Sequence, residues 1–178
     1  MSLPLRSLAN GLTIARAVAG LPLILALQAG WLPLAWWLLL MAGLSDAADG
    51  WLARRAGGGS SWGARLDPLT DKVLIAAPLL WLASTETLPL WAVWLLLARE
   101  LLISGWRAQA GDGGPASLTG KAKTVLQFLA LLLLLWPPAW SGHQQLVVVG
   151  WWLFWPSLLL ALRSAVGYIK PRSRPHQR

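Results

Sequence analysis

The chain has 178 residues, of which 56% are hydrophobic and only 12% charged, and it carries fourteen tryptophans, no cysteine and a formal net charge of +8. This composition excludes an ordinary soluble domain and predicts a polytopic membrane protein. The absence of cysteine also excludes a disulfide framework and thiolate chemistry.

Residues 1–9 alternate apolar and polar side chains, which predicts a short interfacial helix. Asn10 is a candidate cap for the helix that follows, with Thr13 at its third position. A signal peptide is the rival interpretation of this region. It is disfavoured because Arg16 interrupts the apolar core and five more apolar stretches follow.

Six apolar stretches follow one another along the sequence, at residues 12–29, 31–45, 68–83, 88–98, 124–136 and 146–162. Several are shorter than the roughly 20 residues that a membrane span needs. We therefore expect their helices to continue into the polar segments beside them. The predicted fold class is all-α, an integral membrane protein with six transmembrane helices and a polar active site that faces the cytoplasm.

The distribution of basic residues predicts the orientation of these spans. All fifteen Lys and Arg residues lie near the two chain ends, within residues 46–72 or within residues 99–123. The turns expected near residue 30, at 84–88 and at 137–145 contain none. The positive-inside rule then places both termini and the polar segments in the cytoplasm.

An acidic motif connects the second and third apolar stretches. Its first half occupies positions i, i+3, i+4, i+7 and i+8, which share one side of a helix. These residues are Asp46, Asp49, Gly50, Ala53 and Arg54. The small residues leave room for a ligand beside the helix backbone, and the arginine is suited to a phosphate.

The second half of the acidic motif holds Asp67 and Asp71, four residues apart on the next helix. Glycines and serines between the halves favour a turn that makes the two helices antiparallel. Four carboxylates held close together repel one another unless cations bridge them. Oxygen ligands favour hard cations, so we predict two ions of Mg²⁺ or Mn²⁺.

Two other interpretations of the acids stay open. They could pair with neighbouring Arg and Lys side chains as a solvated rim, or line the pore of a divalent-cation channel or transporter. The acids are confined to one predicted membrane face, which argues against a continuous pore.

The spacing of the acidic motif resembles the complete signature of the CDP-alcohol phosphotransferases. The matching pattern is Asp46-x-x-Asp49-Gly50-x-x-Ala53-Arg54, eight residues, then Gly63-x-x-x-Asp67-x-x-x-Asp71. The resemblance implies that the four aspartates hold a dinuclear metal site and that Asp71 also activates the acceptor hydroxyl. The CDP-binding residues that it implies are Asn10, Thr13, Asp49, Gly50, Ala53, Arg54, Gly63 and Asp67. Ala9 stands where the family usually has a proline before the asparagine.

A second polar cluster begins with Arg99 and Glu100, directly after an apolar run. Arg107 lies about two helical turns further on, and Lys121 opens the fifth stretch. We predict that Arg99, Arg107 and Lys121 bind the phosphate of an anionic acceptor, and that Glu100 orients Arg99. Snorkelling of the basic side chains to the membrane interface is the alternative.

Together with Gly120-Lys121-x-Lys123-Thr124-x-x-Gln127, this cluster is similar to the pattern of bacterial phosphatidylglycerophosphate synthases. That similarity implies transfer of the phosphatidyl group of CDP-diacylglycerol to sn-glycerol 3-phosphate, by a homodimer in the bacterial cytoplasmic (inner) membrane. Phosphatidylglycerol, as in cardiolipin synthases, serine and inositol phosphate stay open as acceptors. We expect one domain over residues 1–170 and a basic tail over 171–178 that contacts membrane lipids, and no nucleic-acid partner.

Overall fold

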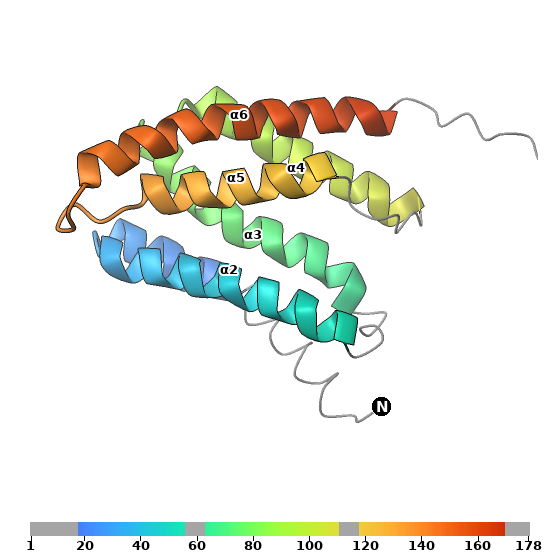
Figure 1. The fold of residues 1–178 in the computed structure, drawn as a ribbon, viewed down its shortest axis with the longest axis horizontal. Helices are drawn as coiled ribbons and strands as arrows, with labels where there is room; N and C mark the ends of the chain where they lie inside the picture. The colour runs from blue at the N-terminus through green and yellow to red at the C-terminus, as the bar shows by residue number, and fades with distance from the viewer. Residues whose placement is uncertain (1–17, 56–62, 111–117, 170–178) are drawn as a thin grey trace, which may run out of the picture.

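The computed structural model describes residues 18–55, 63–110 and 118–169, and within these ranges it contains helices and no strand. The all-α prediction is therefore confirmed for the described residues. A helix described over Val18–Gln28 comes first. It is followed by α2 (Leu32–Arg55), α3 (Gly63–Ser84), α4 (Leu90–Ala110), α5 (Leu118–Leu134) and α6 (His143–Ile169). The helices run roughly along the longest axis of the molecule (Figure 1).

The helices extend beyond the apolar stretches from which they were predicted. Helix α2 has 24 residues, α3 has 22 and α4 has 21, so α2 and α4 continue well past the ends of their apolar runs. At 1.5 Å per residue these three helices are about 31–36 Å long, close to the roughly 30 Å thickness of a bilayer core. The expected continuation of the helices into the polar segments is confirmed.

One described helix is by itself long and apolar enough to cross a membrane, at His143–Ala165. Four other apolar segments are shorter, at Val18–Gln28, Leu32–Ser45, Lys72–Ser84 and Ala122–Leu134. The number of membrane spans therefore stays a prediction.

The turns have local causes. Gly30 has φ +74°, and the amides of Gly30 and Trp31 donate to the carbonyls of Leu27 and Ala26 at 3.1 and 2.9 Å. This paired arrangement is the Schellman motif, which a left-handed glycine allows. The turn predicted at 137–145 is shorter than expected, because α6 already begins at His143. Gly142, with φ +76°, directly precedes this helix.

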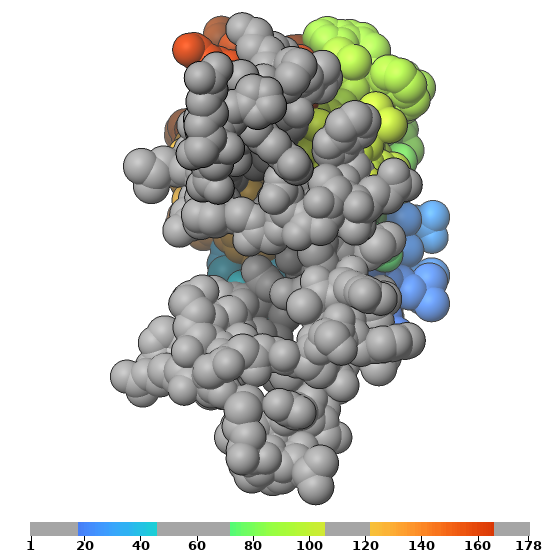
Figure 2. All heavy atoms as spheres, turned by 90° about the vertical axis from the view of Figure 1, so that its right-hand side faces the viewer, coloured from blue at the N-terminus to red at the C-terminus, as the bar shows by residue number. Residues whose placement is uncertain are grey.

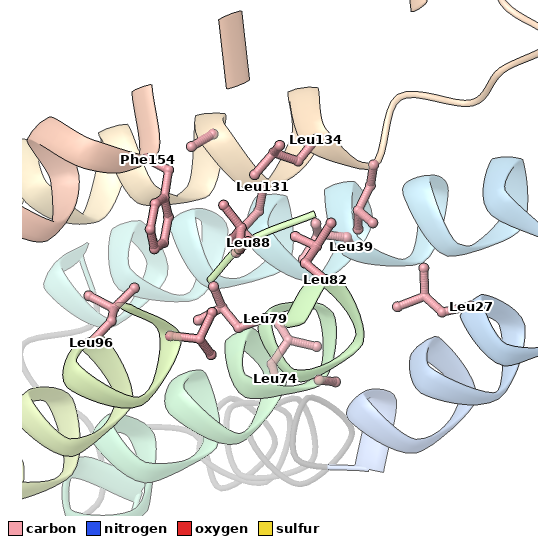
Figure 3. Close-up of a cluster of buried hydrophobic side chains, with 14 of the residues drawn as sticks. Leu27, Leu39, Leu74, Leu79, Leu82, Leu88, Leu96, Leu131, Leu134 and Phe154 are labelled. Carbon is pink, nitrogen blue, oxygen red and sulfur yellow. The ribbon is translucent and has the colours of Figure 1, made fainter. Parts of the chain in front are cut away.

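Leucine and alanine fill the interior between the helices. Figure 3 shows the cluster of buried side chains with Leu27, Leu39, Leu74, Leu79, Leu82, Leu88, Leu96, Leu131, Leu134 and Phe154 labelled. Helices α5 and α6 approach each other closely at Gly150, where a Cβ atom would lie 2.9 Å from the Leu134 amide nitrogen. Small residues at such positions let helix backbones pack tightly in membrane proteins.

Large apolar side chains also cover the outside of the molecule. Every described helix exposes some of them, including Leu21, Trp37, Leu80, Trp94, Val125 and Trp152. A soluble monomer rarely exposes so much apolar surface, whereas lipid chains are a suitable solvent for it. Several tryptophans also form edge-to-face pairs, among Trp36, Trp37, Trp136 and Trp140.

Candidate active site

The segments that carry the two polar motifs gather at one end of the molecule. In Figure 1 the end of α2, the beginning of α3, the end of α4 and the beginning of α5 all lie toward the right. The end of α6 lies on the same side. Figure 2 looks onto this end, with α4 and α6 in its upper part and the earlier helices lower down. An active site that combines the acidic and the basic motif needs this shared placement.

The acidic motif lies on two consecutive helices. Residues 46–54 belong to the unbroken helix α2, so the predicted spacing along one helix side holds for Asp46, Asp49 and Arg54. Asp67 and Asp71 lie in α3, one turn apart, and Gly63 is its first residue. Only residues 56–62 separate the two helices, which limits the distance between their ends.

The side chains of the acidic motif lie outside the part of the chain that the structure describes, as do those of Arg107 and Lys121. Asn10 and Thr13 lie wholly outside the described ranges. The metal, CDP and base assignments of these residues therefore stay predictions. The helix positions fit them, because four carboxylates on two connected helices form an oxygen donor set suited to Mg²⁺ or Mn²⁺. Among the side chains that are described, no group of three His, Cys, Asp or Glu residues could hold a metal ion.

Arg99 is the predicted acceptor ligand whose side chain the structure describes. It is 9% exposed and its guanidinium points toward α6 as well as toward its neighbour on α4. Nε donates to the Ala161 carbonyl at 2.8 Å, and Nη2 donates to the Ser164 hydroxyl. Nη1 donates to Oε1 of Glu100 at 2.9 Å. The orienting contact that the sequence predicted for Glu100 is present.

Glu100 also joins α4 to α5. The same carboxylate oxygen that contacts Arg99 accepts a hydrogen bond from Nζ of Lys123. The exposed fractions of the Glu100 and Lys123 side chains are 13% and 7%. Charges are costly to bury unless they are paired, so the shared carboxylate explains how two cations lie nearly buried in one place. The cluster of Arg99, Glu100 and Lys123 carries a net charge of +1 in its ionised form.

Sequence reasoning did not assign a role to two members of this arrangement. Lys123 belongs to the sequence pattern of the second polar cluster, but that pattern gives it no role. Its burial against Glu100 becomes visible only when the helices are packed together. Ser164 lies 65 residues from Arg99 in a helix without a recognisable motif. No signal in the sequence points to it.

The comparison with known proteins agrees with the motifs. Residues 6–163 match the CDP-alcohol phosphatidyltransferase family. The chain belongs to this family. The enzymes of this family generally depend on a divalent metal, so the acidic ends of α2 and α3 are the part of this CDP-alcohol phosphatidyltransferase in which such an ion is expected.

Curated relatives within the family are similar along most of their length. A Mycobacterium tuberculosis protein named "Probable phosphatidylglycerophosphate synthase" is 35% identical over 171 residues, which are 92% of this chain and 80% of the relative. A Rickettsia felis protein named CDP-diacylglycerol--glycerol-3-phosphate 3-phosphatidyltransferase is 33% identical over 177 residues, 93% of this chain and 94% of the relative. A Shigella flexneri protein with the same name is 36% identical over 158 residues, 83% of each chain.

Proposed function

We propose that this CDP-alcohol phosphatidyltransferase transfers the phosphatidyl group of CDP-diacylglycerol to sn-glycerol 3-phosphate, which gives phosphatidylglycerophosphate and CMP. The observation that carries the proposal is the similarity over most of the chain to relatives whose names state this reaction. The cationic cluster around Arg99 agrees with it, because glycerol 3-phosphate brings a phosphate that a neutral alcohol lacks.

In this proposal the four aspartates of α2 and α3 hold two divalent ions, Mg²⁺ or Mn²⁺. When bound, such ions neutralise charge on the pyrophosphate and stabilise the leaving nucleotide. The CDP moiety lies along the side of α2 that carries Asp49, Gly50, Ala53 and Arg54, next to Gly63 and Asp67 of α3 and to Asn10 and Thr13. The small side chains at positions 50 and 53 leave space for it beside the helix.

Asp71 serves as the general base. It accepts the proton of the attacking glycerol phosphate hydroxyl, whose oxygen then forms a bond to the phosphorus that bears the diacylglycerol. The bond from that phosphorus to the CMP oxygen breaks, and CMP leaves with the electron pair. The residues of this chain contribute mainly by holding both substrates in line and by electrostatic stabilisation.

In this proposal the phosphate of the acceptor alcohol binds to Arg99, Arg107 and Lys121. Within the described residues, the hydrogen bonds of Arg99 use three of its five N–H groups. Among the described residues, one N–H on Nη1 and one on Nη2 have no other partner, and we propose that they bind phosphate oxygens. Such a planar pair of donors suits a tetrahedral anion.

We also propose the membrane arrangement predicted from the charges, with six spans, both termini in the cytoplasm and the active site on the cytoplasmic side of the bacterial inner membrane. The apolar outer surface, the lengths of α2 to α4 and the placement of both motifs at one end of the molecule support it. Residues 1–170 form one membrane domain, the tail over 171–178 contacts anionic lipid, and the protein acts as a homodimer.

The proposal is tested with purified protein in detergent micelles that contain CDP-diacylglycerol and Mg²⁺ or Mn²⁺. CMP release is measured with glycerol 3-phosphate, phosphatidylglycerol, serine or inositol phosphate, beside an Asp71→Asn control. We expect release that requires glycerol 3-phosphate and disappears in the control. Release with a different acceptor alone contradicts the proposed substrate, and no release with any acceptor from folded protein contradicts the proposed activity.

A further inference from the structure

The C-terminal half of α6 contacts the cationic cluster although it carries no sequence motif. Two of its groups, the Ala161 carbonyl and the Ser164 hydroxyl, accept hydrogen bonds from the Arg99 guanidinium. These contacts join residues that are 62 and 65 positions apart in the sequence. They place α6, the last described helix, against Arg99 of the predicted acceptor site.

The hydrogen-bond geometry of Ser164 defines which way its hydroxyl faces. Its Oγ donates to the Ala161 carbonyl at 2.9 Å, within the same helix. A serine hydroxyl has one proton and two lone pairs, so once the proton is committed to Ala161 the oxygen can only accept from Arg99. Ser164 therefore acts as an oriented acceptor for the arginine.

The contacts to α6 and to Glu100 determine the plane of the guanidinium. Nε and Nη2 face α6, while Nη1 faces Glu100, which itself holds Lys123 of α5. An arginine held on two sides has a fixed guanidinium plane, which also fixes the directions of its remaining N–H groups. Pre-organisation of this kind strengthens anion binding because less side-chain freedom is lost when the ligand arrives.

We infer that α6 is part of the acceptor subsite and that Ser164 is a positioning residue, which orients Arg99 for the phosphate of the acceptor alcohol. This inference rests on the proposed function, because it takes the ligand of Arg99 to be glycerol 3-phosphate. It adds a residue from the last helix to an active site whose motifs all lie before residue 128.

The matched control for Ser164 lies on the same helix. Ser157 is seven residues earlier, is fully buried, and its hydroxyl donates to the Phe154 carbonyl at 2.7 Å. It thus repeats the local geometry of Ser164 on about the same side of α6, two turns away. Ser157→Ala removes the same group from the same helix without touching Arg99.

The experiment measures the KM for glycerol 3-phosphate, the KM for CDP-diacylglycerol and kcat from CMP release by the full-length protein in micelles. We expect Ser164→Ala to raise the KM for glycerol 3-phosphate about fivefold to tenfold, the size of effect that follows the loss of one ordinary hydrogen bond. The KM for CDP-diacylglycerol stays within about twofold. Ser164→Thr, which keeps a hydroxyl able to bond the preceding turn, restores most of the affinity. Ser157→Ala leaves the KM for glycerol 3-phosphate unchanged.

Several results would overturn the inference. It is wrong if Ser164→Ala leaves the KM for glycerol 3-phosphate unchanged, if it weakens both substrates equally, or if Ser157→Ala has the same effect. It is also wrong if Ser164→Thr behaves like the alanine variant while it unfolds at the wild-type temperature. Failure of the proposed function looks different, because the wild-type protein itself then shows no release of CMP that depends on glycerol 3-phosphate.

Discussion

Replacing Glu100 by Gln removes the carboxylate that Arg99 and Lys123 share. The substitution keeps the size of the side chain and one oxygen that can accept a hydrogen bond, so it changes the charge with little change in packing. It leaves two nearly buried cations, 9% and 7% exposed, beside each other without their common anion. We therefore expect Glu100→Gln to destabilise the contacts of α4 with α5 and α6.

The expected magnitude follows from this burial. Removing one partner of a buried ion pair costs about 3–5 kcal/mol, and the partial exposure of Glu100 favours the lower value, about 3 kcal/mol. Lys123→Met should cost only about 1 kcal/mol, because Glu100 and Arg99 then still form a pair. In the double variant the two cations no longer repel each other, so we expect a total of about 2 kcal/mol. The two substitutions should thus be non-additive by about 2 kcal/mol.

The double-mutant cycle is measured by reversible unfolding in mixed micelles with increasing sodium dodecyl sulfate, followed by tryptophan fluorescence. Glu86→Gln is the matched control, since Glu86 lies exposed in the turn between α3 and α4. It should leave the unfolding curve unchanged. Additivity of Glu100→Gln and Lys123→Met within about 0.5 kcal/mol would refute the shared-carboxylate explanation. So would a Glu100→Gln variant as stable as the wild type.

Three further predictions concern other parts of the molecule. Gly150→Ala should destabilise the protein by about 1–3 kcal/mol, because its Cβ would lie 2.9 Å from a backbone nitrogen of α5. The Cβ of Gly105→Ala would meet nothing within 4 Å, so this control should stabilise α4 by up to about 1 kcal/mol. The same unfolding assay compares them, and equal effects would contradict the close contact. Trp36→Phe should cost about 1 kcal/mol, because it removes the 2.9 Å hydrogen bond from the indole to the Leu132 carbonyl. An unchanged unfolding midpoint in that variant would argue against this bond. Chelation with EDTA should abolish CMP release, and added Mg²⁺ or Mn²⁺ should restore it. The Asp71→Asn variant should stay inactive at every metal concentration. CMP release in the presence of EDTA would exclude the metal assignment.

Local patterns predicted the helices and the positions of the predicted site residues along them. The positions of Asp46, Asp49 and Arg54 along one side of α2 follow from the helical period alone, and the structure keeps residues 32–55 in one helix. The continuation of α4 past Arg99 was also predictable, because no turn residue follows the apolar run. The exact start of α6 was not, since the turn signals around Gly142 extend over several residues.

The amino-acid sequence by itself determined the family, the helical character and the acidic motif, because each depends on residue types at short, fixed spacings. Only the tertiary structure decided that Glu100 joins Arg99 to Lys123 and that Ser164 of α6 holds the same arginine. The physical reason is that such contacts depend on which helix faces meet. Apolar segments made mainly of leucine, alanine and tryptophan can pack in many rotations, and the periodicity of one helix does not specify its neighbour.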